Sequence, residues 1–322
     1  MTQLQQPIGS PFSAASTAAD VIRGTDLTGR KVIVTGGHSG IGLETVRSLA
    51  GAGAEVLVPA RDPERAKAAL EGIARVQVDQ MDLTDASSIA DFGQRVTSSG
   101  MAVDMLINSA GIMATPQSRD AEGHESQFAT NHLGHFRLTA SLWPALVRSG
   151  NSRVVSVSSR GHQIAGVDFD DIDFWTRPYD KWVAYGQSKT ANALFAMELD
   201  KLGKASGVRA FSLHPGQVLT ALARHLSEEE IAGFDARDER GELRVDPSRG
   251  MKTVPQAAAT SVWAATSLLL EGMGGVYLED CEVASINDTE AGRKGVAYWA
   301  ADPDLAERLW MVSEEMTGVS IG

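Results

Sequence analysis

The sequence predicts a single doubly wound α/β domain with a mostly parallel sheet of about seven strands. Short segments rich in Val, Ile and Leu alternate with helix-like segments between residue 31 and about residue 285. Such alternation produces βαβ units, whose right-handed crossovers build a parallel sheet with helices on both faces. Hydrophobic residues make up 43% of the 322 residues and charged residues 22%, ordinary values for a soluble chain that buries a large core.

The expected strands cover residues 31–36, 55–60, 76–81, 105–110, 153–159, 208–214 and 274–279. Between them, apolar residues spaced three and four apart predict helices. The helices cover residues 43–53, 64–73, 87–96, 126–146 and 188–203, and residues 302–318 form a terminal helix. In an open sheet of this Rossmann type, ligands bind at the carboxyl ends of the strands.

Two excursions interrupt the alternation. Residues 221–255 are charged and contain Gly and Pro, which predicts helical pieces and a long loop: either a C-terminal substrate loop or lid, or a solvated surface excursion. Residues 166–182 separate the fifth strand from the next helix. Residues 1–25 are polar and small, which predicts a loose N-terminal arm ahead of a single domain that covers residues 26–322.

Charge and composition exclude several classes of protein. A net charge of −12 argues against nucleic acid and anionic membranes as partners. No apolar run approaches the ~20 residues of a membrane helix, and the first residues do not resemble a signal peptide, so we expect a cytoplasmic protein. The single cysteine, Cys281, excludes an internal disulfide and a multi-cysteine metal site. The histidines show no metal-ligand pattern, and no catalytic metal is predicted.

A glycine-rich turn follows the first strand and precedes a helix. Gly36, Gly40 and Gly42 are spaced G-x-x-x-G-x-G. Such a turn lets the backbone approach a pyrophosphate, and the N-terminus of the next helix offers free N–H groups to it. His38 lies within the turn and either touches a cofactor phosphate or faces solvent. The sequence therefore predicts a dinucleotide site here.

The end of the second strand bears on the choice between NADP(H) and NAD(H). An acidic residue at this point holds the ribose hydroxyls of NAD(H), whereas an arginine accommodates the 2′-phosphate of NADP(H). Here Ala60 ends the strand and Arg61 follows, which favours NADP(H). Asp62 is able to reach the ribose instead, but ahead of Pro63 it also suits a helix N-cap.

Tyr185 and Lys189 are spaced for proton transfer, because residues four apart share one face of a helix. A nearby ammonium favours the phenolate and moves the tyrosine pKa from about 10 towards neutrality. Such a tyrosine acts as general base or general acid. The alternative is an amphipathic surface pair. Ser158 and Ser159 end the fifth strand, where a hydroxyl can hydrogen-bond a substrate oxygen.

Other polar residues accompany this pair. Asn131 lies inside an expected helix, where a buried amide needs partners at both ends, and a water towards Lys189 would provide one. Asn108 ends the fourth strand. Five large side chains either line a substrate pocket or, as we favour for each alone, simply pack: Trp175, Tyr179, Trp182, Met251 and Trp263.

Six motifs in this order resemble the short-chain dehydrogenase/reductase superfamily: TGGHSGIG (35–42), NSAG (108–111), TNHLGHF (130–136), VVSVSS (154–159), YGQSK (185–189) and HPGQVLT (214–220). The resemblance runs from about residue 25 to the C-terminus. The segment 169–189 and the closing ERLWMVSEEMTG are similar to the retinol-dehydrogenase-like branch. Ser109 and Ser156 depart from asparagines common in the family, and neither departure puts the function in doubt.

The resemblance implies a catalytic tetrad of Asn131, Ser159, Tyr185 and Lys189. Tyr185 would be the acid/base, Lys189 would also bind the nicotinamide ribose, Ser159 would orient the substrate oxygen and Asn131 would hold a relay water. Ser158 would be structural. The implied cofactor-binding residues are Gly36, His38, Ser39, Gly40, Ile41, Gly42, Arg61, Asp82, Leu83, Asn108, Ala110, Gly111, Tyr185, Lys189, Pro215, Gly216, Val218 and Thr220.

The expected function is NAD(P)-dependent interconversion of an alcohol, a hydrophobic or aromatic secondary one, with its ketone or aldehyde, with NADP(H) preferred. One alternative is a redox-sensing protein that binds NADP(H) without turnover, which the complete tetrad opposes. Another is a sugar-nucleotide epimerase or dehydratase, for which residues 221–322 are too few and too helical. The resemblance also implies a homodimer or homotetramer, formed through the helices that carry Asn131 and Tyr185.

Overall fold

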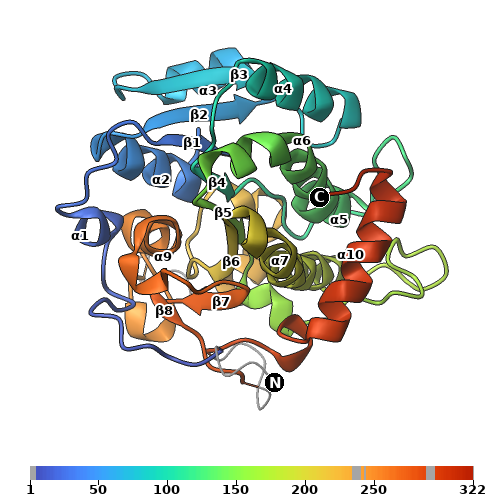
Figure 1. Cartoon of the computed structure of the whole chain (residues 1–322). Coiled ribbons are helices and arrows are strands. Elements are labelled where there is room, and N and C mark those ends of the chain that lie inside the picture. Colours follow the sequence, from blue (N-terminus) through green and yellow to red (C-terminus); the bar gives the residue numbers. More distant parts are fainter. Residues whose placement is uncertain (1–4, 234–240, 243, 288–293, 322) are drawn as a thin grey trace.

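The computed structural model describes residues 5–233, 241–242, 244–287 and 294–321 (Figure 1). Its centre is a sheet in which the described residues form eight strands, in the order β3-β2-β1-β4-β5-β6-β7-β8. The first seven are parallel, and β8 runs antiparallel to β7. The strands are β1 (Lys31–Val34), β2 (Glu55–Ala60), β3 (Val76–Gln80), β4 (Met105–Asn108), β5 (Ser152–Val157), β6 (Val208–His214), β7 (Val276–Glu279) and β8 (Glu282–Val283). The predicted fold class is therefore confirmed.

Helices cover both faces of the sheet (Figure 1). One face carries α1 (Ala18–Ile22), α2 (Gly40–Gly51) and α9 (Val254–Thr266), which share a buried cluster with alternate strand residues such as Val32 and Val34. The other carries α4 (Ala86–Ser98), α6 (Gly134–Ser149) and α7 (Lys181–Gly203), whose cluster includes Ile33 and Trp310 of α10 (Pro303–Thr317). Strands buried on both faces explain why their sequences are nearly continuous in apolar residues.

Capping residues start most of the long helices where the sequence places a short polar side chain. Asp62, Asp85, Asp180 and Asp302 accept backbone N–H groups at the starts of α3 (Pro63–Ala69), α4, α7 and α10. Thr253 forms a capping box at the start of α9. A side-chain oxygen at this position satisfies N–H groups that the helix itself leaves unpaired.

The expected helix at residues 126–146 is interrupted. It divides into α5 (Ser126–Phe128), a π-helical turn (Ala129–Leu133) that contains Asn131, and α6. The π turn could not be predicted from the sequence, because side-chain periodicity does not distinguish a π turn from an α turn. Helix α7 also starts seven residues earlier than expected, because Asp180 caps it.

The sequence predicts a loose N-terminal arm. From residue 5 onward the arm is instead packed against the domain. Gln5 is 7% exposed. Its amide bonds the backbone of Tyr277 and Ala284. The Glu282 carboxylate accepts three consecutive N–H groups from residues 8–10, and α1 packs on α9 and α2. Apart from α2, the partners that order the arm lie more than 200 positions away in the sequence, and its polar composition does not reveal them.

Residues 221–255 contain helical pieces, as predicted: a 3-10 turn (Ala221–His225), α8 (Glu228–Gly233) and a 3-10 turn (Pro247–Arg249). The segment then returns to the end of β6, where Gln217 N donates to Gly250 O at 2.8 Å and Lys252 N to Gln217 O at 2.9 Å. Residues 234–240 and 243 of this excursion lie outside the described residues. The excursion ends sooner than predicted, because α9 begins at Val254.

Candidate active site

The polar residues predicted for catalysis meet beyond the carboxyl ends of β4 and β5. Ser159 follows β5 and starts a 3-10 turn, η2 (Arg160–Gln163), in which its Oγ accepts the Gly161 N–H at 3.0 Å. The Ser159 hydroxyl also lies close enough to the phenol of Tyr185 to lower the pKa of that phenol. A methyl group at Gly161 would lie 2.6 Å from a Tyr185 ring carbon, so a glycine is needed for the turn to pack against the ring.

Lys189 and Asn131 approach the same point from α7 and the π turn. The buried Lys189 Nζ donates to Val157 O at 3.0 Å and lies 5.8 Å from the centre of the Tyr185 ring. A methyl group at Gly111 would lie 3.0 Å from Asn131 Oδ1 and 3.5 Å from Lys189 Nζ. The four residues of the expected tetrad are thus brought together by three separate elements.

The protein itself satisfies the Asn131 amide. Its Oδ1 accepts Ile112 N–H at 2.9 Å, and its Nδ2 donates to Ile112 O at 3.0 Å and to Ser188 Oγ at 2.9 Å. The partners expected for both ends of the buried amide are therefore present in the protein, because the segment after β4 folds back over the side chain. The relay water of Asn131 stays a prediction. Ser158 Oγ donates to Lys189 O at 2.6 Å, which fits the structural role predicted for it.

Burial dominates the titration of the proton-transfer pair. It raises the pKa of Tyr185 to about 12, although the neighbouring Ser159 hydroxyl opposes the rise. Burial also lowers the pKa of Lys189 to about 8. We had expected the Tyr185 pKa to move towards neutrality. In the chain by itself it moves the other way, because desolvation of the phenolate outweighs the attraction of an ammonium several ångströms from the ring.

The glycine-rich turn has the geometry of an anion site. A methyl group at Gly42 would lie 2.4 Å from Gly36 O, so this tight packing requires a glycine. Ser39 is the N-cap of α2, but its side chain makes no capping bond. The first N–H groups of the helix are therefore left for a ligand. His38 is half-buried and its Nδ1 has no hydrogen-bond partner among the described residues.

On the adenosine side, Arg61 is exposed just after β2. Asp62 Oδ1 accepts Arg65 N–H at 3.1 Å, which confirms its predicted N-cap role. The positive charge of Arg65 is close enough to contribute, with burial, to lowering the His38 pKa. Asp82 Oδ1 accepts both the N–H and the hydroxyl of Thr84, and Leu83 O lies against Gly134.

Asn108 is the clearest sign of a missing partner. Its side chain is 1% exposed, and neither amide atom has a hydrogen-bond partner among the described residues. An unpaired buried amide is costly, so such groups usually have a partner. A bound polar ligand at the end of β4 would satisfy it. Together with the glycine turn, this shows that the residues present fit a dinucleotide.

Two residues that the sequence analysis did not single out hold the end of β4 in place. Thr35 Oγ1 accepts the N–H groups of Ser109 at 2.9 Å and Ala110 at 3.0 Å, and lies 2.9 Å from His135 Nε2. His135 Nδ1 lies 3.0 Å from Asn131 O. The TGG and HLGHF motifs contained both residues, but their pairing across 100 positions appears only in the fold.

The segment after β6 reaches the phosphate turn. A methyl group at Gly40 would lie 3.5 Å from Thr220 Cγ2, so the two predicted cofactor segments are adjacent. Gly216 has φ +105°, and a side chain there would meet Lys252 Cδ at 2.5 Å. Pro215 is buried, and Val218 and Ile41 are half-buried beside these turns.

Of the five large candidate side chains, Trp182 packs against Tyr185, with ring centres 6.3 Å apart. Its Nε1 donates to Glu230 Oε1 of α8 at 3.1 Å. The others have different surroundings: Trp263 and Met251 are buried, the Tyr179 hydroxyl bonds Thr115 O and Glu125, and Trp175 is 66% exposed under the Arg119 guanidinium.

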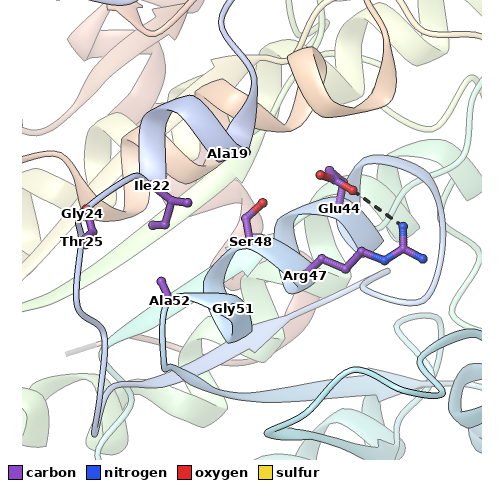
Figure 2. Close-up of a pocket in the computed structure, with 9 residues that line it drawn as sticks. All are labelled: Ala19, Ile22, Gly24, Thr25, Glu44, Arg47, Ser48, Gly51 and Ala52. Atoms are coloured by element: carbon purple, nitrogen blue, oxygen red, sulfur yellow. Dashed lines mark ion pairs between the residues drawn. The ribbon is translucent and has the colours of Figure 1, made fainter.

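A cavity of about 400 Å³ lies between α1 and α2, away from the tetrad (Figure 2). A second, of about 260 Å³, lies beside Arg119 and Asp120. No residue predicted for catalysis or cofactor binding lines either, so we do not assign them to the reaction. Among the described residues no group of His, Cys, Asp or Glu is arranged to hold a metal ion, and no described helix is long and apolar enough to span a membrane.

A family model described as short chain dehydrogenase matches residues 30–231. The chain belongs to the short-chain dehydrogenase family. This short-chain dehydrogenase is 44% identical over 292 residues to a "Probable oxidoreductase" of Streptomyces lividans, covering 88% of the chain and 96% of that protein. It is 36% identical over 299 residues to human "Retinol dehydrogenase 12", covering 91% and 88%. These relatives place it among the oxidoreductases, in the retinol-dehydrogenase-like branch.

Solved structures agree. The short-chain dehydrogenase superposes on an uncharacterized protein from Mycobacterium paratuberculosis with a TM-score of 0.72 and 33% identity, covering 96% of this chain and 99% of that one. It also matches a Beutenbergia cavernae protein described as an NAD(P)-dependent gluconate 5-dehydrogenase, which contains NADP at low occupancy. That match has a TM-score of 0.60 and 25% identity, and covers 79% of this chain and 96% of that one.

Proposed function

We propose that this short-chain dehydrogenase interconverts an alcohol and its ketone or aldehyde with NADP(H), and that Tyr185 is the acid/base. One observation carries the proposal: the buried Tyr185 ring lies beside Ser159 Oγ at the carboxyl edge of the sheet, with Lys189 and Asn131 near it. When bound, the nicotinamide supplies or accepts the hydride. The residues Gly36, Ser39, Gly40, Gly42 and Asn108 would hold the dinucleotide, since they offer a close-approach turn, free N–H groups and an unpaired amide.

Tyr185 and Ser159 would divide the work on the substrate oxygen. Since burial keeps the phenol protonated, Tyr185 is ready to donate its proton to the oxygen as a ketone is reduced. Ser159 Oγ, which lies beside the Tyr185 ring, would orient that oxygen. In alcohol oxidation Tyr185 must first lose its proton. The ammonium of Lys189, charged at pH 7 because its pKa is about 8, then favours the phenolate.

The preference for NADP(H) rests on charge at the end of β2. Arg61 is exposed there, and Arg65 and His38 stand on the same side of the turn. Asp62, the alternative ligand for a ribose without a 2′-phosphate, is engaged as the N-cap of α3. Positive charge without a free carboxylate suits a 2′-phosphate.

For the substrate we propose a hydrophobic or aromatic secondary alcohol or ketone. Trp182 contacts Tyr185 and offers an apolar wall beside the reacting group. The similarity to retinol dehydrogenase 12, which is named for a hydrophobic primary alcohol, supports the hydrophobic character of the substrate.

Nicotinamide absorbance at 340 nm, followed with a panel of such alcohols and ketones, tests the proposal. We expect turnover with NADPH or NADP⁺, and a fall in kcat of about 10²–10⁴-fold for Tyr185→Phe with cofactor affinity nearly unchanged. A Tyr185→Phe variant that keeps wild-type turnover would show that the phenol is not the acid/base. Loss of cofactor binding in that variant would also count against this role.

A further inference from the structure

Two buried side chains outside the predicted tetrad converge on the backbone carbonyl of Ser159. His162 Nδ1 lies 2.7 Å from Ser159 O, and the Tyr277 hydroxyl of β7 donates to the same oxygen at 3.3 Å. The two side chains also contact each other, with Nδ1 and the phenol oxygen 3.1 Å apart and ring centres 4.8 Å apart. His162 is 1% exposed and Tyr277 is 2% exposed, so neither side chain contacts solvent appreciably.

The surroundings of His162 fix its tautomer. The backbone N–H of Ala297 donates to Nε2 at 3.1 Å, so Nε2 carries the lone pair. A neutral ring then carries its proton on Nδ1, where it donates to Ser159 O. Burial lowers the pKa of His162 to about 4 and raises that of Tyr277 well above its usual value, so both stay neutral near pH 7. Trp299 Nε1 adds a hydrogen bond to His162 O at 2.9 Å.

The carbonyl and the hydroxyl of Ser159 belong to one residue, the extended N-cap of η2. Its Oγ accepts the Gly161 N–H, and both Oγ and the turn that follows lie beside the Tyr185 ring. If the carbonyl moves, the direction of the hydroxyl moves with it. We propose that His162 and Tyr277 are positioning residues: by binding Ser159 O they keep the Ser159 hydroxyl directed towards the Tyr185 phenol. The proposal rests on the proposed function, and it assigns a role to β7 and to the segment around Ala297.

A double-mutant cycle with Ser159→Ala tests this coupling. Tyr277→Phe removes a single hydroxyl, and we expect it to lower kcat on the order of 10-fold while the affinity for NADPH stays unchanged. In the Ser159→Ala background the same substitution should have no further effect, because the hydroxyl that it positions is gone. Equal losses in both backgrounds would overturn the proposal. Tyr179→Phe is the matched control, since it also removes hydrogen bonds of a partly buried phenol but does not touch Ser159.

Substitutions of His162 separate its two contacts. Asn places its amide near the former Nδ1 and can still donate to Ser159 O, whereas Gln reaches towards Nε2 and retains the partner of Ala297. We expect His162→Asn to keep more of the wild-type kcat than His162→Gln, even where both lose similar thermal stability. The reverse order would show that the ring serves the C-terminal segment and not Ser159.

A measurement that needs no turnover completes the test. In the ¹⁵N NMR spectrum of the full-length protein, His162 should show a protonated Nδ1 and an unprotonated Nε2 from pH 5.5 to pH 8. A protonated Nε2, or titration near the usual histidine pKa of about 6.5, would overturn the network. If wild-type protein turns over no substrate, the proposed function fails by itself. Turnover that needs Tyr185, with an additive cycle, rejects only the positioning role.

Discussion

At the residue scale, burial of the Lys189 ammonium lowers the stability of the folded protein. The pKa of Lys189 falls from 10.5 to about 8 because its ammonium is desolvated, and the ammonium donates to Val157 O. Each pKa unit corresponds to about 1.4 kcal/mol, so the shift is equivalent to roughly 3 kcal/mol of lost stability. A buried charge of this kind is typical of functional positions, because packing alone does not require a charged side chain there.

We therefore expect Lys189→Met to abolish turnover and yet to raise the free energy of unfolding at pH 7, by about 1–3 kcal/mol. Because the folded pKa is the lower one, the unfolded state binds more protons between pH 8 and pH 10.5. The stability of the wild type therefore rises over this interval, and the advantage of the methionine should shrink. Urea unfolding at pH 7 and pH 9.5 measures both. A variant less stable than wild type at pH 7 would show that the ammonium is well paired.

Arg61 is the residue on which cofactor choice should depend. Arg61→Ala should weaken NADPH binding by about 10- to 100-fold and leave NADH nearly unchanged, because a charge-assisted hydrogen bond to the 2′-phosphate contributes about 1.5–3 kcal/mol. Lys67→Ala is the control, since Lys67 is also an exposed cation of this region but pairs with Glu64. Fluorescence titration of both cofactors gives the ratio. Equal weakening of NADPH and NADH would remove Arg61 from the 2′-phosphate site.

At the scale of elements, one acidic side chain ties α8 to the start of α7. Glu230 pairs with Lys181 at 2.7 Å and accepts from Trp182 Nε1 at 3.1 Å. The Lys181 contact is the main reason that its pKa falls to about 2, so the carboxylate stays charged throughout the neutral range. Trp182 lies against Tyr185, and the excursion at residues 221–255 is thereby linked to the proposed substrate site.

Breaking this link should affect substrate binding more than chemistry. We expect Glu230→Ala to raise KM for the alcohol several-fold with a smaller change in kcat, and to shift Trp182 fluorescence. Glu230→Gln, which still accepts from the indole, should have a weaker effect on KM. Glu64→Gln, at an exposed pair on α3, is the matched control. An unchanged KM in Glu230→Ala would mean that α8 is a surface excursion, the alternative that the sequence left open.

At the scale of the whole molecule, α10 closes the core on one side of the sheet (Figure 1). Trp310 stacks on Phe195 of α7 with ring centres 6.0 Å apart and meets Phe136 of α6 edge-on at 5.0 Å. Trp310→Ala should cost about 3–5 kcal/mol, as large-to-small changes of aromatic residues in cores do. Met311→Ala, at a residue 57% exposed on the same helix, should cost little. Chemical denaturation compares the two, and equal losses would mean that α10 contributes by its helix alone.

The same packing bears on assembly. We expected a homodimer or homotetramer to form through the helices that carry Asn131 and Tyr185. In the structure α10 lies on α7, and most α7 side chains are buried within the one chain. The homodimer or homotetramer stays a prediction.

A feature of this protein could be predicted from the sequence when the residues that produce it are close together in the chain. Strands buried on both faces, a glycine turn before a helix and polar residues at strand ends are local patterns, and they predicted the sheet, the phosphate turn and the residues of the tetrad. Asp62 as an N-cap was equally local, because the cap and its helix are adjacent. The family motifs added the roles, which spacing alone did not supply.

Only the tertiary structure decided what depends on distant partners. It ordered the N-terminal arm against β7 and β8, widened the helix at Asn131 into a π turn and placed α10 on α7. It also reversed the expected shift of the Tyr185 pKa, because desolvation is a property of the packed interior. The sequence was enough to propose which residues carry the chemistry. The charge that they bear, and the side chains such as His162 and Tyr277 that hold them, depend on contacts that exist only in the folded chain.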